Sequence, residues 1–122
     1  MLPVTTGQKA LQEAFGNYNL VYAYNASSDT WTQRANMVQA TGHIGSSTIP
    51  YKNCGLFVLG GAINTGGKTN AVFYYSIGFN NWTNIGSMNN QVNTPVCSIL
   101  GDWIYCQSGQ LSSQLSYRRK IG

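Results

Sequence analysis

Residues 24–37 read YNASSDTWTQRANM, and residues 75–88 read YSIGFNNWTNIGSM. The two stretches carry Tyr, Trp, Thr and Met at matching positions, and each residue of the second lies 51 places after its counterpart in the first. Agreement of four residue types at one spacing is very improbable by chance, so the sequence predicts an internal repeat of about 50 residues. The residues that define it are Tyr24, Trp31, Met37, Tyr75, Trp82 and Met88.

Short β-branched and aromatic runs bounded by turn residues predict strands throughout the chain. Helical periodicity is weak everywhere except at residues 8–15, where one short turn of helix is expected. The sequence therefore predicts an all-β fold. The predicted strands are Leu20 to Tyr24, Asp29 to Thr32, Leu56 to Leu59, Ala71 to Tyr75, Val96 to Leu100 and Trp103 to Cys106.

The pair of strands after Pro95 predicts a tight hairpin, because Gly101-Asp102 fits a two-residue type II′ turn. With this turn, Leu100 pairs with Trp103, and Cys97 lies directly across from Cys106. At a non-hydrogen-bonded position, Cα atoms are about 4.5 Å apart, at the short end of the range that a disulfide tolerates. The two residues form either a disulfide or two buried free thiols. Cys54 is left over as a free thiol.

An apolar strand that ends in a glycine pair, followed by a Tyr and then by a Trp after six intervening residues, resembles the kelch repeat. Here the pattern comprises Leu56 to Gly61, with Gly60 and Gly61 as the pair, then Tyr75 and Trp82. The resemblance implies kelch-type β-propeller blades, each a four-stranded antiparallel sheet, with about two and a half blades in this chain. It implies a partial blade at 1–37, a complete blade at 38–88 and a partial blade at 89–122.

Within the complete blade, the resemblance places the inner strand at 42–49, the second at 55–60, the third at 70–76 and the outer strand at 81–87. Residues 20–33 become the third and outer strands of the preceding blade, with Val4 to Gly7 as a remnant of its second strand. Residues 94–118 begin the next blade. Because blades are packed on both sides, the hairpin after Pro95 is expected to bury both its faces, one carrying Ile99 and Ile104 and the other Leu100, Trp103 and Tyr105.

The chain departs from the kelch pattern in places. The third glycine pair is Ser108-Gly109 and the first is Thr6-Gly7, while Thr41 and Val92 lie near the position where an Arg often follows the Met. Two and a half blades also leave open sheet edges, a known aggregation hazard. We therefore expect either a fragment of a longer chain or a homo-oligomer whose copies complete each other's blades.

Charged residues make up only 8% of the chain, and the formal net charge is +4. The only basic cluster is Arg118, Arg119 and Lys120, which is too small for the basic stripe of a nucleic-acid-binding protein. No apolar run reaches the 18 to 20 residues that a membrane-spanning helix needs. A surface of neutral polar groups is more typical of extracellular or cell-surface proteins than of cytosolic ones.

Catalytic groups are sparse. His43 is the only histidine, and the acidic residues are Glu13, Asp29 and Asp102. These residues predict neither a Ser-His-Asp triad, nor the several imidazoles of a copper site, nor the paired carboxylates of a glycosidase. We expect no enzymatic activity, no cofactor and no metal.

Three predicted loops would share one end of a propeller channel, at 34–42, 62–69 and 88–94. Their amide side chains suit peptide backbone or carbohydrate hydroxyls, although solvated turns explain them equally well. The main hypothesis is a non-catalytic protein-binding or scaffolding module; the alternatives are a self-assembling structural unit and a remnant of a secreted carbohydrate-active or oxidase propeller. The candidate binding residues are Arg34, Asn36, Gln39, Asn64, Lys68, Asn89, Asn90, Gln91 and Asn93.

Overall fold

The computed structural model describes residues 4–6, 19–64, 67–92, 95–107 and 116–121. Over these ranges the chain is all-β, as the sequence predicts, and its regular elements are antiparallel strands. No helix long and apolar enough to cross a membrane is found among them. The helical turn expected at 8–15 and the predicted Ser108-Gly109 pair lie outside the described residues.

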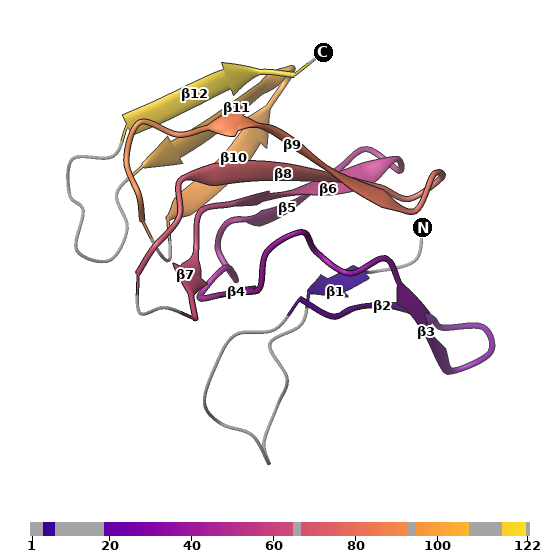
Figure 1. The fold of residues 1–122 in the computed structure, drawn as a ribbon. Helices are drawn as coiled ribbons and strands as arrows, with labels where there is room; N and C mark the ends of the chain where they lie inside the picture. Colours follow the sequence, from indigo (N-terminus) through magenta and orange to yellow (C-terminus); the bar gives the residue numbers. More distant parts are fainter. Residues whose placement is uncertain (1–3, 7–18, 65–66, 93–94, 108–115, 122) are drawn as a thin grey trace.

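The strands form three principal sheets (Figure 1). The N-terminal sheet has the order β1-β2-β3, the central sheet β5-β6-β8-β9 and the C-terminal sheet β10-β11-β12. A small fourth pair joins β4 to β7. The bounds are β1 (Val4–Thr6), β2 (Val21–Asn25), β3 (Thr30–Arg34), β4 (Thr41–Gly42), β5 (Thr48–Tyr51), β6 (Gly55–Leu59), β7 (Ala62–Ile63), β8 (Ala71–Ser76), β9 (Asn81–Ser87), β10 (Val96–Leu100), β11 (Trp103–Gln107) and β12 (Ser116–Lys120).

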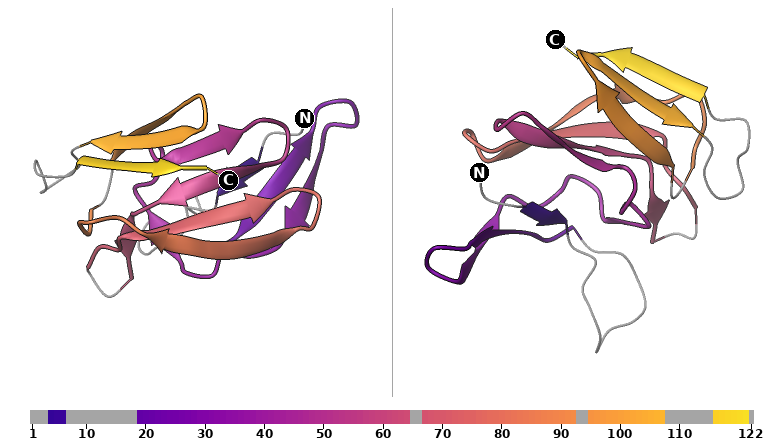
Figure 2. Two further views of the ribbon diagram at one scale, coloured as in Figure 1. Left: turned by 90° about the horizontal axis from the view of Figure 1, so that it is seen from above. Right: turned by 180° about the vertical axis from the view of Figure 1, so that it is seen from behind.

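The three principal sheets succeed one another in chain order, with the central sheet between the other two (Figures 1 and 2). Each gap between them holds its own apolar cluster. Between the N-terminal and central sheets, Val21, Met37, Leu56, Val58 and Tyr75 are buried together. Burial of each such side chain removes apolar surface from water, which stabilises the stack by about 25 cal/mol for every Å² buried.

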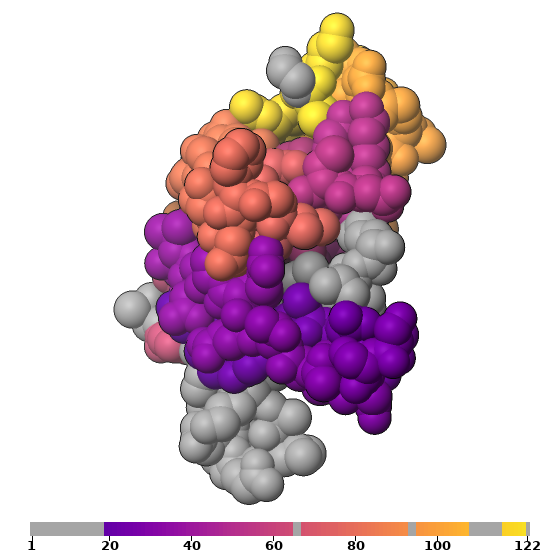
Figure 3. Space-filling view, turned by 90° about the vertical axis from the view of Figure 1, so that its right-hand side faces the viewer, coloured from indigo at the N-terminus to yellow at the C-terminus, as the bar shows by residue number. Residues whose placement is uncertain are grey.

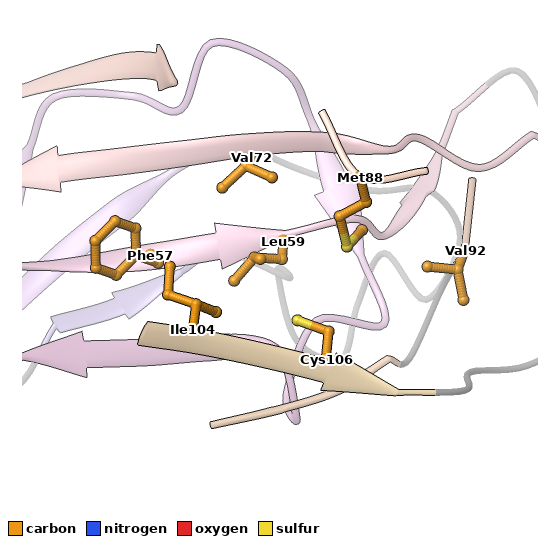
Figure 4. Packing of buried hydrophobic residues seen from close by; sticks show 7 residues of the cluster. All are labelled: Phe57, Leu59, Val72, Met88, Val92, Ile104 and Cys106. Atoms are coloured by element: carbon orange, nitrogen blue, oxygen red, sulfur yellow. The ribbon is translucent and has the colours of Figure 1, made fainter. Parts of the chain in front are cut away.

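The second cluster joins the central and C-terminal sheets (Figure 4). It contains Phe57 and Leu59 of β6 and Val72 of β8, which pack against Ile104 and Cys106 of β11. Both faces of the central sheet are therefore covered. This explains why all five residues of β6 are buried, whereas β3 is mostly exposed.

Two hairpins repeat the same turn. Asp29 before β3 has φ 51 and Asn80 before β9 has φ 51, and the two residues are 51 places apart in the sequence. Asn and Asp tolerate this left-handed conformation better than other non-glycine residues do. In the third hairpin Gly101 has φ 60 while Asp102 keeps a negative φ, as the predicted type II′ turn requires.

The glycine pair after β6 is required by close backbone contacts. Gly60 has φ 69, and an added Cβ would lie 2.6 Å from the carbonyl oxygen of Val92. Gly61 has φ 120, and its amide donates to that same oxygen at 2.8 Å. The pair thus fastens the end of β6 to the segment that follows β9, which a residue with a side chain could not do without displacing the backbone.

Two expectations about strands and faces are wrong. The first strand of the central sheet is not 42–49: residues 43–47 lie in a turn region, Thr41–Gly42 pairs with β7, and the sheet begins at β5. β5 contains Pro50, which the sheet tolerates because β5 is an edge strand. The hairpin after Pro95 buries only its Ile104 side, because the face with Leu100 has no sheet packed on it among the described residues.

Candidate functional site

The repeated motif builds the same local structure twice. Tyr24 and Trp31 are paired across β2 and β3 with ring centroids 4.9 Å apart at 43°, and Tyr75 and Trp82 are paired across β8 and β9 at 5.0 Å and 43°. Each tyrosine hydroxyl donates to the side chain in the following turn. Tyr24 Oη lies 2.9 Å from Asp29 Oδ1, and Tyr75 Oη lies 2.7 Å from Asn80 Oδ1.

The second copy of the motif receives the end of β3 from the N-terminal sheet. Arg34 donates from Nε to Tyr75 Oη at 2.8 Å and from Nη2 to the carbonyl oxygen of Ile77 at 2.8 Å. The backbone of Ala35 completes the contact, because its amide donates to Asn80 Oδ1 at 2.9 Å and its carbonyl accepts from Trp82 Nε1 at 2.9 Å. The motif is therefore a receptor for an arginine-containing strand end.

The first copy has the same receptor geometry on an open surface. Tyr22 and Tyr24 lie on one face of β2, with Trp31 beside them on β3, and Trp31 is 59% exposed. We call these three residues the Tyr24 face. By contrast, Tyr75 is fully buried and Trp82 is half-buried. The same pair of rings thus serves as an internal contact in the central sheet and as surface in the N-terminal sheet.

The three predicted binding loops are brought together by backbone hydrogen bonds. Thr41 of the first loop pairs with Ile63 of the second. The second loop in turn meets the third, because the amide of Val92 donates to the carbonyl oxygen of Thr69 at 3.3 Å. The structure therefore gathers these segments at one place, although what they bind there stays a prediction.

The candidate residues of these loops have different environments. Arg34 is half-buried and occupied with Tyr75 and Ile77, so it acts in the contact between sheets. Asn36 is exposed and accepts from Gln33 Nε2 at 3.4 Å. Asn93 lies outside the described residues. Of the others, Asn64, Asn89 and Gln91 are exposed, and Gln39, Lys68 and Asn90 are half-buried.

A second candidate surface lies on the outer side of the C-terminal sheet. The register places Leu100 opposite Trp103, and Tyr105 opposite Arg118, all on one face. Val96 on this face is 63% exposed and Leu100 is 67% exposed. The Arg118 guanidinium lies 5.0 Å from the centre of the Trp103 ring, a cation–π geometry. We call these residues, Val96, Leu100, Trp103, Tyr105 and Arg118, the Trp103 face.

The Trp103 face is hollowed. A groove of about 500 Å³ runs along it, lined among others by Val96, Ser98, Tyr105, Gln107, Ser116 and Arg118. The inner side of the same strands is held firmly, because Cys97 and Cys106 are paired in register and joined by a disulfide with a Cα–Cα distance of 4.1 Å. The groove therefore lies on a sheet whose opposite face is stabilised by this disulfide. Cys54 is free and exposed.

A second hollow of about 340 Å³ lies between the central and C-terminal sheets. Phe57 and Tyr74 line it with their rings tilted at 47° and the ring centroids 4.9 Å apart, and desolvation raises the pKa of Tyr74. Arg119 lines it and passes close to Gly86, where an added Cβ would lie 2.7 Å from Nη1. At this junction the arginine comes from the later sheet, whereas Ile85 lies where the repeat offset places the counterpart of Arg34.

Of the titratable residues considered for catalysis, Glu13 lies outside the described residues, and the other three lie apart in turns and bends. His43 is exposed with φ 55, and Asp29 and Asp102 are exposed in hairpin turns. Within the described ranges, no three His, Cys, Asp or Glu side chains are grouped so that they could hold a metal ion.

Comparison with known proteins gives the class of fold. No protein-family model matches the sequence, and no curated protein is similar to it. The solved structure of YjhT is similar to this chain with a TM-score of 0.64 and 16% sequence identity, covering 75% of this chain and 26% of that one. The chain thus spans about a quarter of that structure's length, and the likeness concerns the all-β fold alone.

The sequence singled out the aromatic residues of the repeat but not the exposed face of the C-terminal sheet. Trp103 and Tyr105 were expected to be buried, because a propeller blade is covered on both sides. The signal in the sequence was the charge pattern: Arg118 and Lys120 alternate with Arg119, so two cations of the run share the outer face of β12. A fully buried face would not carry two unpaired cations.

Proposed function

We propose that this chain is a non-catalytic protein-binding module built of kelch-like repeats, and that the Trp103 face is its binding surface. The main observation in support is that two apolar side chains of this face, Leu100 and Val96, are exposed. They lie beside the aromatic rings of Trp103 and Tyr105 and the guanidinium of Arg118. Aromatic residues and arginine are enriched at protein interfaces, and an exposed contiguous apolar patch marks an interaction site. A groove with this lining suits a protein side chain better than a small polar ligand.

The rigidity of the C-terminal sheet supports this proposal. Its inner side packs Ile104 and Cys106 into the central core, and the Cys97–Cys106 disulfide ties β10 to β11. A surface that is already ordered loses less conformational entropy when a partner binds. The face therefore meets a general requirement of a recognition surface.

The kelch-like part of the proposal is supported by the order of the sheets and by the junction between the first two. A four-stranded antiparallel central sheet lies between two others, and Arg34 links the first sheet to the Tyr75–Trp82 pair of the second. Propellers are built from successive four-stranded sheets of this kind. The repeat of about 50 residues agrees with the length of a kelch blade.

Site-specific photo-crosslinking tests the binding surface. A benzoylphenylalanine placed at Tyr105 should form adducts with a protein partner, because it keeps an aromatic ring in the groove. The matched control is the same probe at Phe79, which is 84% exposed but lies in the β8–β9 turn, away from the face. Adducts formed equally at both positions, or at neither, would contradict the proposal.

A further inference from the structure

We infer that the partner of the Trp103 face is a second copy of this chain, which docks its Tyr24 face there. This inference rests on the proposed function, because it names the partner of the same surface. It follows from how the three sheets already pack on one another within a single chain. The two exposed faces are the two ends of that stack.

The internal junctions show which kind of face meets which. At the first junction, the side of the N-terminal sheet that carries Val21 packs against the Tyr75 side of the central sheet. At the second, the opposite side of the central sheet, with Phe57 and Val72, packs against Ile104 of the C-terminal sheet. Each sheet thus uses one side towards the preceding sheet and the other side towards the following sheet.

The two exposed faces correspond to the two different sides of a sheet: the Tyr24 face to the side that contacts a preceding sheet, and the Trp103 face to the side that contacts a following sheet. The Tyr24 face is the repeat counterpart of the Tyr75–Trp82 side, which receives a preceding sheet. The Trp103 face is the side of the C-terminal sheet turned away from the central sheet, and so it is the side that a following sheet would cover. Placing the first on the second therefore continues an established interface. Figure 3 shows β2–β3 and β10–β12 towards opposite ends of the molecule, with the central strands between them.

The chemistry of the two faces is complementary. The Tyr24 face has Asp29 at its edge, where the central motif has the neutral Asn80. The Trp103 face has Arg118, with Lys120 beside it on the same side of β12. The exposed Trp31 offers a large aromatic side chain, and the Trp103 face offers the groove of about 500 Å³. Opposite charges and an aromatic anchor beside a groove favour docking in this orientation.

The number of copies follows from closure. Contact between two different faces is head-to-tail, and such contacts end either in a ring or in an open filament. Two copies contribute six principal sheets, which lies within the four to eight blades of known propellers. We therefore infer a closed pair with two equivalent contacts, each between the Tyr24 face of one copy and the Trp103 face of the other.

The test is the absolute mass in solution over a wide concentration range, for the whole chain and for three variants. Trp31→Lys removes the aromatic side chain and places on the Tyr24 face a charge of the same sign as Arg118, Leu100→Glu places a negative charge on the Trp103 face, and Phe79→Glu is the matched control on neither face. All three side chains are more than half exposed, so folding should not depend on them. Circular dichroism verifies this, and Trp31→Ala and Leu100→Ala replace any charged variant that fails to fold.

A head-to-tail pair makes a specific prediction for mixtures. Trp31→Lys and Leu100→Glu should each weaken dimerisation about tenfold or more, and Phe79→Glu should leave it unchanged. When the two weakened variants are mixed, one of the two contacts joins two unmodified faces, so a heterodimer should form at concentrations where each variant alone is monomeric. This recovery is expected only if the two faces bind each other.

Other outcomes overturn the inference. A monomer at all concentrations excludes the second copy, as does a dimer that only one of the two variants weakens, because that pattern indicates a face binding itself. A larger assembly excludes the closed pair. The proposed function is judged separately. If the crosslinker at Tyr105 captures a different protein while the chain stays monomeric, the Trp103 face is supported as a binding surface and the second copy is excluded as its partner.

Discussion

The guanidinium of Arg34 donates from Nε to the hydroxyl of Tyr75 across the gap between the first two sheets, 2.8 Å from nitrogen to oxygen, and these residues are 41 positions apart in the chain. The hydroxyl of Tyr75 in turn donates to Asn80 Oδ1, and this oxygen also accepts from the amide of Ala35. A single hydrogen-bonded network therefore joins the end of one hairpin to the turn of the next. It shows how a repeat in the sequence becomes a junction between sheets.

Arg34→Ala should destabilise the fold. The change removes a charged donor from Tyr75 and leaves the carbonyl of Ile77 without its partner, so we expect a loss of about 1 to 3 kcal/mol in the free energy of unfolding. Urea denaturation measures this. Arg34→Lys should recover only part of the loss, because an ammonium cannot reproduce the fork of the guanidinium. The control Arg118→Ala removes an exposed arginine and should change stability little; equal losses in both would show that the network does not stabilise the fold.

The two tryptophans of the repeat should respond differently to the same substitution. Trp82→Phe removes the indole donor that bonds the carbonyl of Ala35 at 2.9 Å, and we expect a loss of about 1 kcal/mol. Trp31→Phe occupies the matching position but is 59% exposed, so its effect should stay within about 0.5 kcal/mol at concentrations where the chain is monomeric. Thermal or urea unfolding compares them. If Trp31→Phe lowers the free energy of unfolding more than Trp82→Phe does, then Trp82 is not the tryptophan that joins two sheets.

Removing the disulfide should lower the free energy of unfolding, because the unfolded chain gains conformational entropy when the bond is absent. The bond closes a loop with a sequence separation of 9, for which the chain-entropy estimate is about 2 to 3 kcal/mol. The variant Cys97→Ser with Cys106→Ser should lose about this amount in urea denaturation, and Cys54→Ser, at the exposed free thiol, should lose almost none. Thiol labelling of the denatured, unreduced protein should modify one cysteine per chain. Modification of all three would show that the bond is absent.

Asp29→Gly should lower the pKa of Tyr24, because glycine removes the carboxylate and tolerates the φ of 51 at this position. The hydroxyl donates to the Asp29 carboxylate, and this hydrogen bond to the protonated phenol raises the pKa above its ordinary value. Since the bond needs the phenol proton, its contribution is present at neutral pH and is lost as the pH rises through the raised pKa. A tyrosine titration followed by NMR measures the change, with Tyr74 as the control, because desolvation is the main cause of its raised pKa. An unchanged Tyr24 in the variant contradicts the bond.

The sequence predicted the strands well where local signals were strong. The register of Cys97 with Cys106 is confirmed, because a two-residue turn fixes every pair of its hairpin. The strand at 81–87 was placed by the kelch resemblance rather than by a local signal, and β9 is found at Asn81–Ser87. The first strand of the central sheet was placed too early, at 42–49, whereas β5 is found at Thr48–Tyr51 and carries Pro50, which is tolerated because β5 lies at the edge of its sheet. The role of Arg34 was also missed: a loop residue in the sequence proved to be a link between sheets.

By itself the sequence determined the all-β class, the repeat of the Tyr–Trp motif and the turn at Gly101-Asp102, because propensity, spacing and turn chemistry act over a few residues. Only the tertiary structure decided that Tyr75 is fully buried while Trp31 lies open, and that Ile104 is covered while Leu100 is not. The physical reason is that burial depends on which sheet packs against a face, and that contact joins residues tens of positions apart. Identical motifs can therefore be core in one sheet and surface in the next.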